Sequence, residues 1–189
     1  MKCTECGSTM TKKIGDHPYA ESGLPHVILR NVAEYRCPKD GTEFVELERV
    51  AQLHRLIAEI LSDKPARLMP GEVRFLRDHM ALNNRQFAQL LGVTESQSSR
   101  WVSATNPEQM NLAAEYFLRA LATMGPITLV TDDAAVTQIG KMEGGKFVEL
   151  VAHGFGKLPP RDAPTQALAT AIRRTSSSDW KAETQLATV

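Results

Sequence analysis

The sequence predicts an α+β chain with three parts: a small β domain, an all-α domain and a small mixed α/β region. Two knuckle-like turns, at residues 3–7 and 37–41, enclose a segment rich in β-forming residues. Apolar residues at helical spacing, with strong capping signals, follow over residues 70–124. After residue 124 the hydrophobic pattern is irregular, and the elements it predicts are short. We place the three parts at residues 1–63, 64–125 and 126–189.

Length and composition are those of an ordinary globular protein. The 189 residues are 42% hydrophobic and 23% charged, with no net charge, which is enough for one large or two small cores. No apolar run approaches the about 20 residues of a membrane span, and the first residues lack the apolar core of a signal peptide. We therefore expect a cytoplasmic protein. Thiols stay reduced there, so three cysteines favour a metal site or free thiols over disulfides.

The first knuckle is a C-x-x-C-G sequence with Cys3 and Cys6. Two thiolates at this spacing can hold one tetrahedral zinc ion, and Gly7 allows the turn beneath it. The second knuckle, C-P-K-D-G, keeps the shape but supplies Cys37 and Asp40. A carboxylate oxygen binds zinc less tightly than a thiolate. We expect zinc at the four ligand positions of the two knuckles, Cys3, Cys6, Cys37 and Asp40. The alternative is a degenerate, metal-free knuckle.

Strands and one helix are expected between and after the knuckles, in a zinc-ribbon-like domain. Residues 26–36 are rich in β-formers, and residues 43–47 form another short strand. His17 and His26 stand in this strand or loop context and could replace the aspartate as a ligand. Leucine and isoleucine at helical spacing predict an amphipathic helix over residues 48–62.

The central domain is organised around residues 82–101, which predict two short helices joined by a tight turn. Asn83 is a good N-cap, and Gln86 completes a capping box. Gly92 can adopt a positive φ and so ends the first helix. Thr94 then caps the second helix.

Two further helices flank these. A linker at residues 62–65 leads to a helix that begins at Pro70. Asn106 is the expected N-cap of the last helix, whose apolar stripe covers residues 110–124. The stripe either closes the core of the domain or forms the seam of a dimer, because periodicity alone does not separate the two.

The pair of short helices resembles the helix-turn-helix of Cro/repressor (XRE-type) DNA-binding domains. The matching residues are Leu82, Ala88, Leu90 or Leu91, Gly92, Val93, Ser99, Arg100 and Trp101. The sequence departs from that family at Ser98, where an apolar residue is usual, and at residues 102–104, where E-x-G is usual. The resemblance implies that the second helix enters the major groove of double-stranded DNA.

We expect DNA contacts from this second helix and from the amino end of the helix before it. The candidate residues are Asn84, Arg85, Glu95, Ser96, Gln97, Ser99 and Arg100. The Arg100 guanidinium can bridge O6 and N7 of guanine, whereas Asn84 and Arg85 suit a phosphate. Residues 64–106 hold six Lys or Arg against three Asp or Glu, which agrees with a phosphate-binding surface. The alternative is that these side chains are simply solvated.

The order of the parts carries a second resemblance. The C-x-x-C-G knuckle, the segment P-Y-A-E-S-G-L at residues 18–24, a strand and C-x-x-D-G resemble the YgiT-type zinc-finger family, which includes the MqsA antitoxins. The resemblance covers about residues 1–105. It implies an autorepressing, antitoxin-like transcriptional regulator with a zinc-bound β domain that binds a toxin protein.

The remaining expectations concern assembly, activity and the C-terminus. One helix-turn-helix covers half a site, so we expect a homodimer on DNA, with a monomer as the alternative. The five histidines form no catalytic constellation, so we expect a binding protein rather than an enzyme. The competing function is a protein-interaction module that no longer binds DNA. Residues 126–189 predict strands at 127–131 and 146–152, a short helix around 164–173 and a mobile tail.

Overall fold

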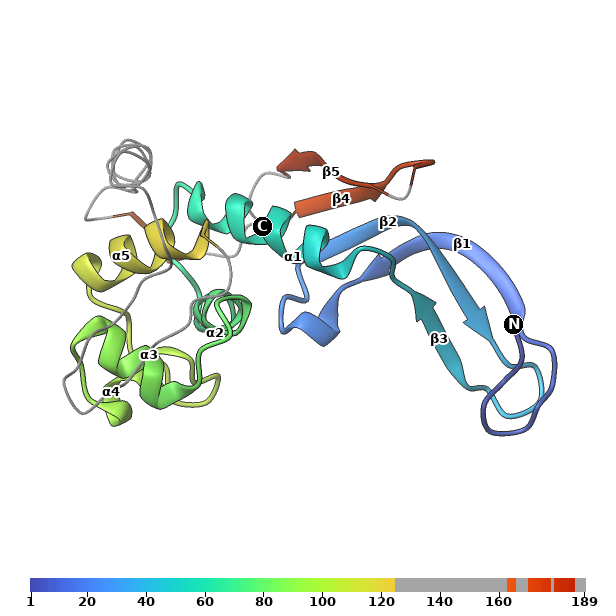
Figure 1. Ribbon diagram of the computed structural model, residues 1–189, viewed down its shortest axis with the longest axis horizontal. Coiled ribbons are helices and arrows are strands. Elements are labelled where there is room, and N and C mark those ends of the chain that lie inside the picture. The colour runs from blue at the N-terminus through green and yellow to red at the C-terminus, as the bar shows by residue number, and fades with distance from the viewer. Residues whose placement is uncertain (125–162, 166–169, 178, 186–189) are drawn as a thin grey trace. The chain divides into compact units, whose positions relative to one another are not determined.

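The computed structural model describes residues 1–124, 163–165, 170–177 and 179–185 (Figure 1). Within them the chain is a mixed α+β protein with five α-helices and a five-stranded mixed sheet. It divides into two compact units, one containing Met1–Leu56 and the C-terminal strands, the other beginning at Ile57. The strands expected at 127–131 and 146–152 lie outside the described residues.

Along the described part of the chain, three strands are followed by five consecutive helices and then by two further strands. They are β1 (Thr11–Pro18), a 3-10 turn (Ala20–Ser22), β2 (Val27–Arg36), β3 (Glu43–Glu46), α1 (Val50–Ser62), α2 (Pro70–His79), α3 (Asn84–Leu91), α4 (Glu95–Trp101), α5 (Leu112–Ala122), β4 (Thr170–Arg174) and β5 (Trp180–Gln185). None of the helices in these ranges combines the length and the apolar character that crossing a membrane requires.

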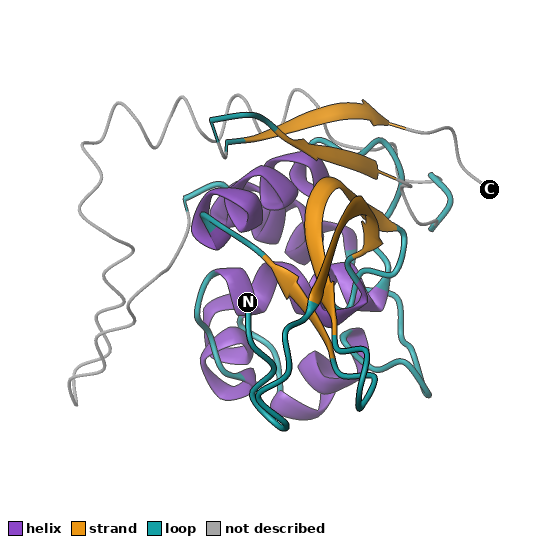
Figure 2. Cartoon of the chain, turned by 90° about the vertical axis from the view of Figure 1, so that its right-hand side faces the viewer, coloured by secondary structure: helices purple, strands orange, loops and turns teal. Residues whose placement is uncertain are grey.

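Strand β2, labelled in Figure 1, is the centre of the sheet and pairs on both sides. Figure 2 shows the strands of this sheet in orange. Along one side β1 runs antiparallel to β2, with Thr11 opposite Arg36. On the other side β2 changes partner: residues 27–30 pair in parallel with β4, and residues 33–36 pair antiparallel with β3. Asn31 lies at this change with a φ of 61°, a conformation that asparagine tolerates better than most residues.

The C-terminal strands correct two expectations. Residues 170–174 form β4 instead of the end of a helix, and β5 occupies much of the expected mobile tail. Trp180 anchors them because it is buried and its indole N–H donates to the Glu48 carbonyl at 2.8 Å. Strands β4 and β5 therefore belong to the same sheet as β1, β2 and β3 and to the first compact unit.

The second unit is helical and has its own core. Its buried apolar side chains come from α2, α3, α4 and α5, and they include Val73, Phe75, Leu76, Met80, Phe87, Ala88, Trp101, Leu118 and Leu121. Helix α2 begins at Pro70, as expected. Helix α5 begins five residues later than the sequence predicted, because Asn111 rather than Asn106 is its N-cap. The Asn111 side chain accepts from the Ala114 N–H at 2.9 Å.

Residues 62–65 were expected to form a linker, but they are held inside the second unit. Arg119 of α5 is buried, and its guanidinium donates to four carbonyls of this segment, those of Leu61, Ser62, Lys64 and Ala66. Such charge-assisted hydrogen bonds satisfy the carbonyls at the end of α1, which have no partner within the helix.

The apolar stripe predicted over residues 110–124 is buried in part, with Ala113 exposed and Phe117 and Met124 half-buried. Met110, Ala114, Leu118 and Leu121 are all buried within a single chain. These residues therefore close the core, which was one of the two roles that the periodicity allowed.

Candidate nucleic-acid interface and candidate metal centre

The turn between α3 and α4 forms from local sequence signals. The Asn83 side chain accepts from the Gln86 N–H at 2.9 Å, and the Gln86 side chain accepts from the Asn83 N–H at 3.0 Å. This is the expected capping box. Gly92 has a φ of 66° and ends α3, and Thr94 caps α4 by accepting from the Gln97 N–H at 3.2 Å.

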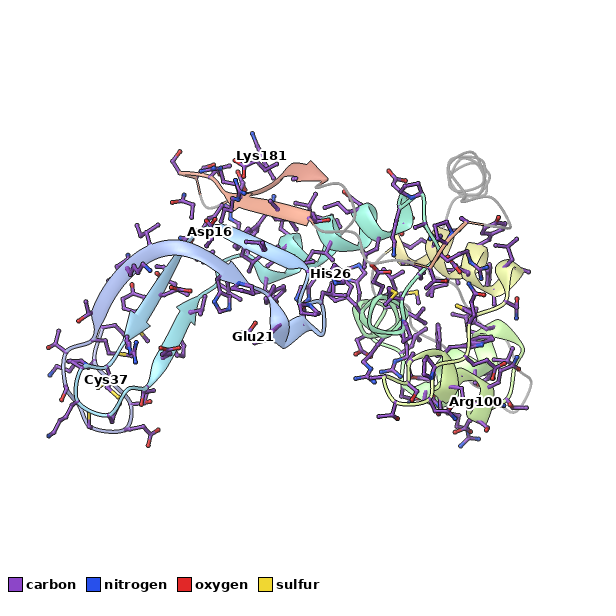
Figure 3. All side chains as sticks on the ribbon, turned by 180° about the vertical axis from the view of Figure 1, so that it is seen from behind. Asp16, Glu21, His26, Cys37, Arg100 and Lys181 are labelled. Atoms are coloured by element: carbon purple, nitrogen blue, oxygen red, sulfur yellow. The ribbon has the colours of Figure 1, made fainter. Side chains whose placement is uncertain are left out.

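Helix α4 has seven residues and two distinct sides. Trp101 and Ser98 are buried, and Phe87 and Ala88 are the buried residues of the neighbouring α3. The other side is open to solvent. Its exposed residues are Glu95, Ser96, Ser99 and Arg100, with Gln97 half-buried. Together with the exposed Arg85 on α3, these are candidate residues that the sequence predicted. Arg100 is labelled in Figure 3.

Asn84 is the candidate whose surroundings differ most from the expectation. Its amide nitrogen donates to the Glu95 carbonyl at 3.1 Å and to Ser99 Oγ at 3.0 Å. Its amide oxygen accepts from Ser98 Oγ at 2.7 Å. The side chain therefore bonds to α4, and both of its N–H groups are already in use.

Arg100 is also engaged. Its guanidinium lies 3.1 Å from the Glu108 carboxylate, and the Glu108 N–H donates to the Arg100 carbonyl at 3.2 Å. Sequence reasoning missed both Glu108 and Ser98 as parts of this site. No local pattern in the sequence fixes the path of the loop before Glu108. Serine is a weak helix former, so the sequence alone gives Ser98 no role before its hydrogen-bond partner is known.

Fewer positive charges are exposed around this site than the number of Lys and Arg in residues 64–106 suggests. Lys64 and Arg67 are buried, and they pair with Glu72 at 2.5 Å and with Glu115 at 2.6 Å. They cannot contact a phosphate in this fold. The basic side chains of residues 64–106 that reach solvent are arginines at 74, 77, 85 and 100.

The two knuckles adopt the same backbone shape. The Cys3 N–H donates to the Ser8 carbonyl, and the Gly7 N–H donates back to Cys3. The Cys37 N–H likewise donates to the Thr42 carbonyl, and the Gly41 N–H donates to Cys37. Both glycines have positive φ, 69° and 77°. The aspartate in the second knuckle therefore leaves its backbone unchanged.

Four potential ligand atoms meet between the knuckles: the sulfurs of Cys3, Cys6 and Cys37 and a carboxylate oxygen of Asp40. All lie within 4.8 Å of one another. Cys37 is labelled in Figure 3. Cys6 Sγ lies 3.4 Å from Cys37 Sγ, and Cys3 Sγ lies 3.3 Å from an Asp40 oxygen. Three thiols and a carboxylate at these distances could hold one metal ion.

Hydrogen bonds within this cluster shift the pKa values of Asp40 and Cys6. Donation from Cys6, Thr42 and Cys37 holds the pKa of Asp40 below its usual range. The negative carboxylate in turn raises the pKa of Cys6 to about 11. A metal ion that binds here must therefore displace the Cys6 proton.

Neither histidine considered as a replacement ligand joins this cluster. His17 instead contacts two carboxylates, with Nδ1 3.1 Å from Glu34 and Nε2 3.0 Å from Glu21. Asp40 is therefore the fourth group that the described fold places beside the three cysteines.

The chain matches no family profile, no curated protein and no solved structure. The resemblances to XRE-type and YgiT-type proteins remain predictions from the sequence.

Proposed function

We propose that the chain is a sequence-specific DNA-binding transcriptional regulator that acts by binding and not by catalysis. The observation that most supports this is the two-sided α4, which is attached by Trp101 and Ser98 and leaves Glu95, Ser96 and Arg100 exposed. A helix that follows α3 through a tight glycine turn and has one free polar side can enter a major groove.

Each exposed side chain then has a distinct role. Arg100 reads guanine, because a guanidinium can donate to O6 and N7 together. Ser96 and Gln97 lie near the start of α4, where side chains reach base edges. Arg85 and the amino end of α3 bind a phosphate. Glu95 can only accept, so it pairs with the amino group of cytosine.

The proposed assembly is a homodimer on a palindromic site, with reading helices about 34 Å apart. A second copy doubles the phosphate contacts, which matters because only a few arginines near α4 reach solvent. The buried part of the α5 stripe is unavailable as a seam, so the dimer would form elsewhere. Light scattering at micromolar concentration, with and without operator DNA, checks this. A monomer that binds one half-site with full affinity would exclude the dimer.

The proposed metal is zinc, bound by Cys3, Cys6, Cys37 and Asp40. Three thiolates and one carboxylate suit its tetrahedral preference. The knuckles enclose only a small apolar cluster, built on Cys3, Met10 and Cys37, so a metal would supply folding energy that this end of the sheet lacks. The resemblance to antitoxins adds the proposal that this zinc-bound part binds a toxin and that the chain represses its own gene.

The competing function is a protein-interaction module that does not bind DNA. Two observations favour it: Lys64 and Arg67 are buried, and Arg100 is paired with Glu108. Both reduce the positive charge available to a phosphate backbone.

A gel-shift assay separates the two functions. The probe is the DNA upstream of the gene that encodes this chain, with a scrambled duplex of the same length and composition as control. A regulator of its own gene shifts the upstream duplex at protein concentrations that leave the scrambled duplex free. Equal binding to both, or binding to neither, would favour the interaction module. A small basic protein that co-purifies with the chain would support the antitoxin role.

A further inference from the structure

The side chain of Asn84 joins the two helices of the proposed DNA-binding motif. It stands at the first residue of α3, yet all three of its hydrogen bonds go to α4. They reach the Glu95 carbonyl, Ser99 Oγ and Ser98 Oγ, so they cover the first four-residue turn of α4 and the residue after it. One amide thus connects the start of α3 to the buried Ser98 and also to the exposed Ser99 and the Glu95 backbone of α4.

Ser98 is the buried half of this connection. Its exposed fraction is 0%, and its hydroxyl donates to the Asn84 oxygen at 2.7 Å. A buried hydroxyl without a partner would cost free energy, so the pairing is favoured by burial itself. Besides Ser98, Trp101 is the buried residue of α4. A single aromatic side chain at one end of a short helix leaves the rotation and tilt of the other end poorly determined by packing alone.

We propose that Asn84 is a positioning residue that fixes the orientation of α4 through Ser98, and is not itself a phosphate ligand. This rests on the proposed DNA-binding function and adds the device that aims the reading helix. The donors that a phosphate would need are committed to Glu95 and Ser99. Arg85, the next residue, is exposed and remains the phosphate ligand of this helix end.

The orientation of α4 decides which side chains meet the bases. Ser96, Gln97 and Arg100 lie on a helix of seven residues, so a small rotation moves all of them relative to a groove. Loss of the Asn84 connection should therefore reduce sequence specificity more than it reduces non-specific binding, which depends on the phosphates.

A double-mutant cycle tests the connection. Asn84→Ala, Ser98→Ala and the double variant are compared on the duplex that the wild-type chain selects from a randomised library. If Asn84 acts through Ser98, each single change weakens binding about tenfold, and the double variant loses about tenfold and not about a hundredfold. Losses that multiply would overturn the proposal, because an independent phosphate ligand behaves additively.

Arg85→Ala is the matched control. It removes a neighbouring side chain from the same helix end, and its effect should multiply with that of Ser98→Ala. It should also make the salt dependence of binding shallower by about one unit of slope in log K against log salt. Asn84→Ala should leave that slope unchanged. A coupling of Arg85 to Ser98 as strong as that of Asn84 would contradict the assignment.

Hydrogen exchange of the free chain provides a second measurement that needs no DNA. Asn84→Ala should speed exchange of the amides in α4 and leave those of α5 unchanged, whereas Arg85→Ala should leave both unchanged. Unaltered exchange in α4 would overturn the positioning role. A wild-type chain that binds no duplex would instead overturn the proposed function, and the exchange data would still decide whether Asn84 holds α4.

Discussion

The guanidinium of Arg100 and the carboxylate of Glu108 lie 3.1 Å apart, so the side chain best suited to read a base is already paired within the chain. The two side chains are 49% and 42% exposed. An ion pair at the surface stabilises a protein by about 0–1 kcal/mol. If the chain binds DNA as proposed, a phosphate or base would displace Glu108 at little cost in free energy.

Replacing Glu108 by glutamine should strengthen non-specific DNA binding. The change frees Arg100 and removes a negative charge near the phosphates. We expect non-specific affinity to rise a few-fold and the slope of log K against log salt to steepen by about 0.9, as for one added phosphate contact. Fluorescence anisotropy in a salt titration measures both. Glu59→Gln makes the same charge change on an exposed position of α1, and an equal effect of that variant would show that only net charge matters.

We expect different substitutions in the metal site to change the affinity for zinc by different amounts. Protein purified without chelator should contain about one zinc per chain. Asp40→Cys should tighten binding, because a fourth thiolate replaces a weaker carboxylate, and Cys37→Ser should remove most of the metal. Elemental analysis and competition with a chromogenic chelator check this series. A metal-free protein whose residues 1–10 and 37–42 are nonetheless ordered would show that the knuckles fold without an ion.

His54 should make the first unit sensitive to acid. Its Nε2 lies 2.9 Å from the Tyr19 hydroxyl, and burial lowers the pKa of this histidine below 6.5. The unfolded chain therefore takes up a proton at a higher pH than the folded chain does. The contribution of His54 to stability is complete above about pH 6.5 and is lost as the pH falls through the lowered folded pKa.

Urea denaturation at about pH 7.5 and about pH 5 measures this loss. In His54→Gln the difference between the two conditions should shrink, because glutamine does not titrate in this range. An unchanged difference would assign the acid sensitivity to another group.

Replacing only one member of the buried Lys64–Glu72 pair should strongly reduce the free energy of unfolding. Both side chains have an exposed fraction of 0%. Lys64→Met leaves the Glu72 carboxylate buried beside an apolar group, and we expect a loss of about 3–5 kcal/mol in the free energy of unfolding. Adding Glu72→Gln should recover most of it, since the amide oxygen can still accept from the Met69 N–H. Chemical denaturation of both variants gives the comparison, and a double variant no more stable than the single one would contradict this account.

The parts of the fold that local signals specify could be predicted from the sequence. Asn83, Gly92 and Thr94 each bond within a few residues of themselves, and the structure has all three in their expected roles. The two knuckles were likewise readable, because cysteine spacing and a following glycine fix a turn locally. The expected strand and helix between residues 43 and 62 are also present.

The parts of the fold that depend on contacts between distant residues could not be predicted from the sequence. Strand β4 pairs with β2 across most of the chain, and nothing near Thr170 indicates that partner. Strand β1 is largely exposed and so lacks an apolar alternation. The N-cap of α5 is Asn111 and not the expected Asn106, because the start of α5 depends on where its stripe meets the core. The role of Ser98 likewise depends on a residue of another helix, because its hydroxyl donates to the Asn84 amide oxygen across the turn.

Selection of duplexes from a randomised library tests the central claim most directly, because it needs no knowledge of the operator. The wild-type chain should enrich a palindrome whose half-sites lie about 34 Å apart. Arg100→Ala should enrich the same palindrome with one position relaxed in each half-site, at a cost of about 1–3 kcal/mol. A wild-type selection that enriches no sequence, or an Arg100→Ala selection identical to it in sequence and affinity, would contradict the assignment of α4 as the reading helix.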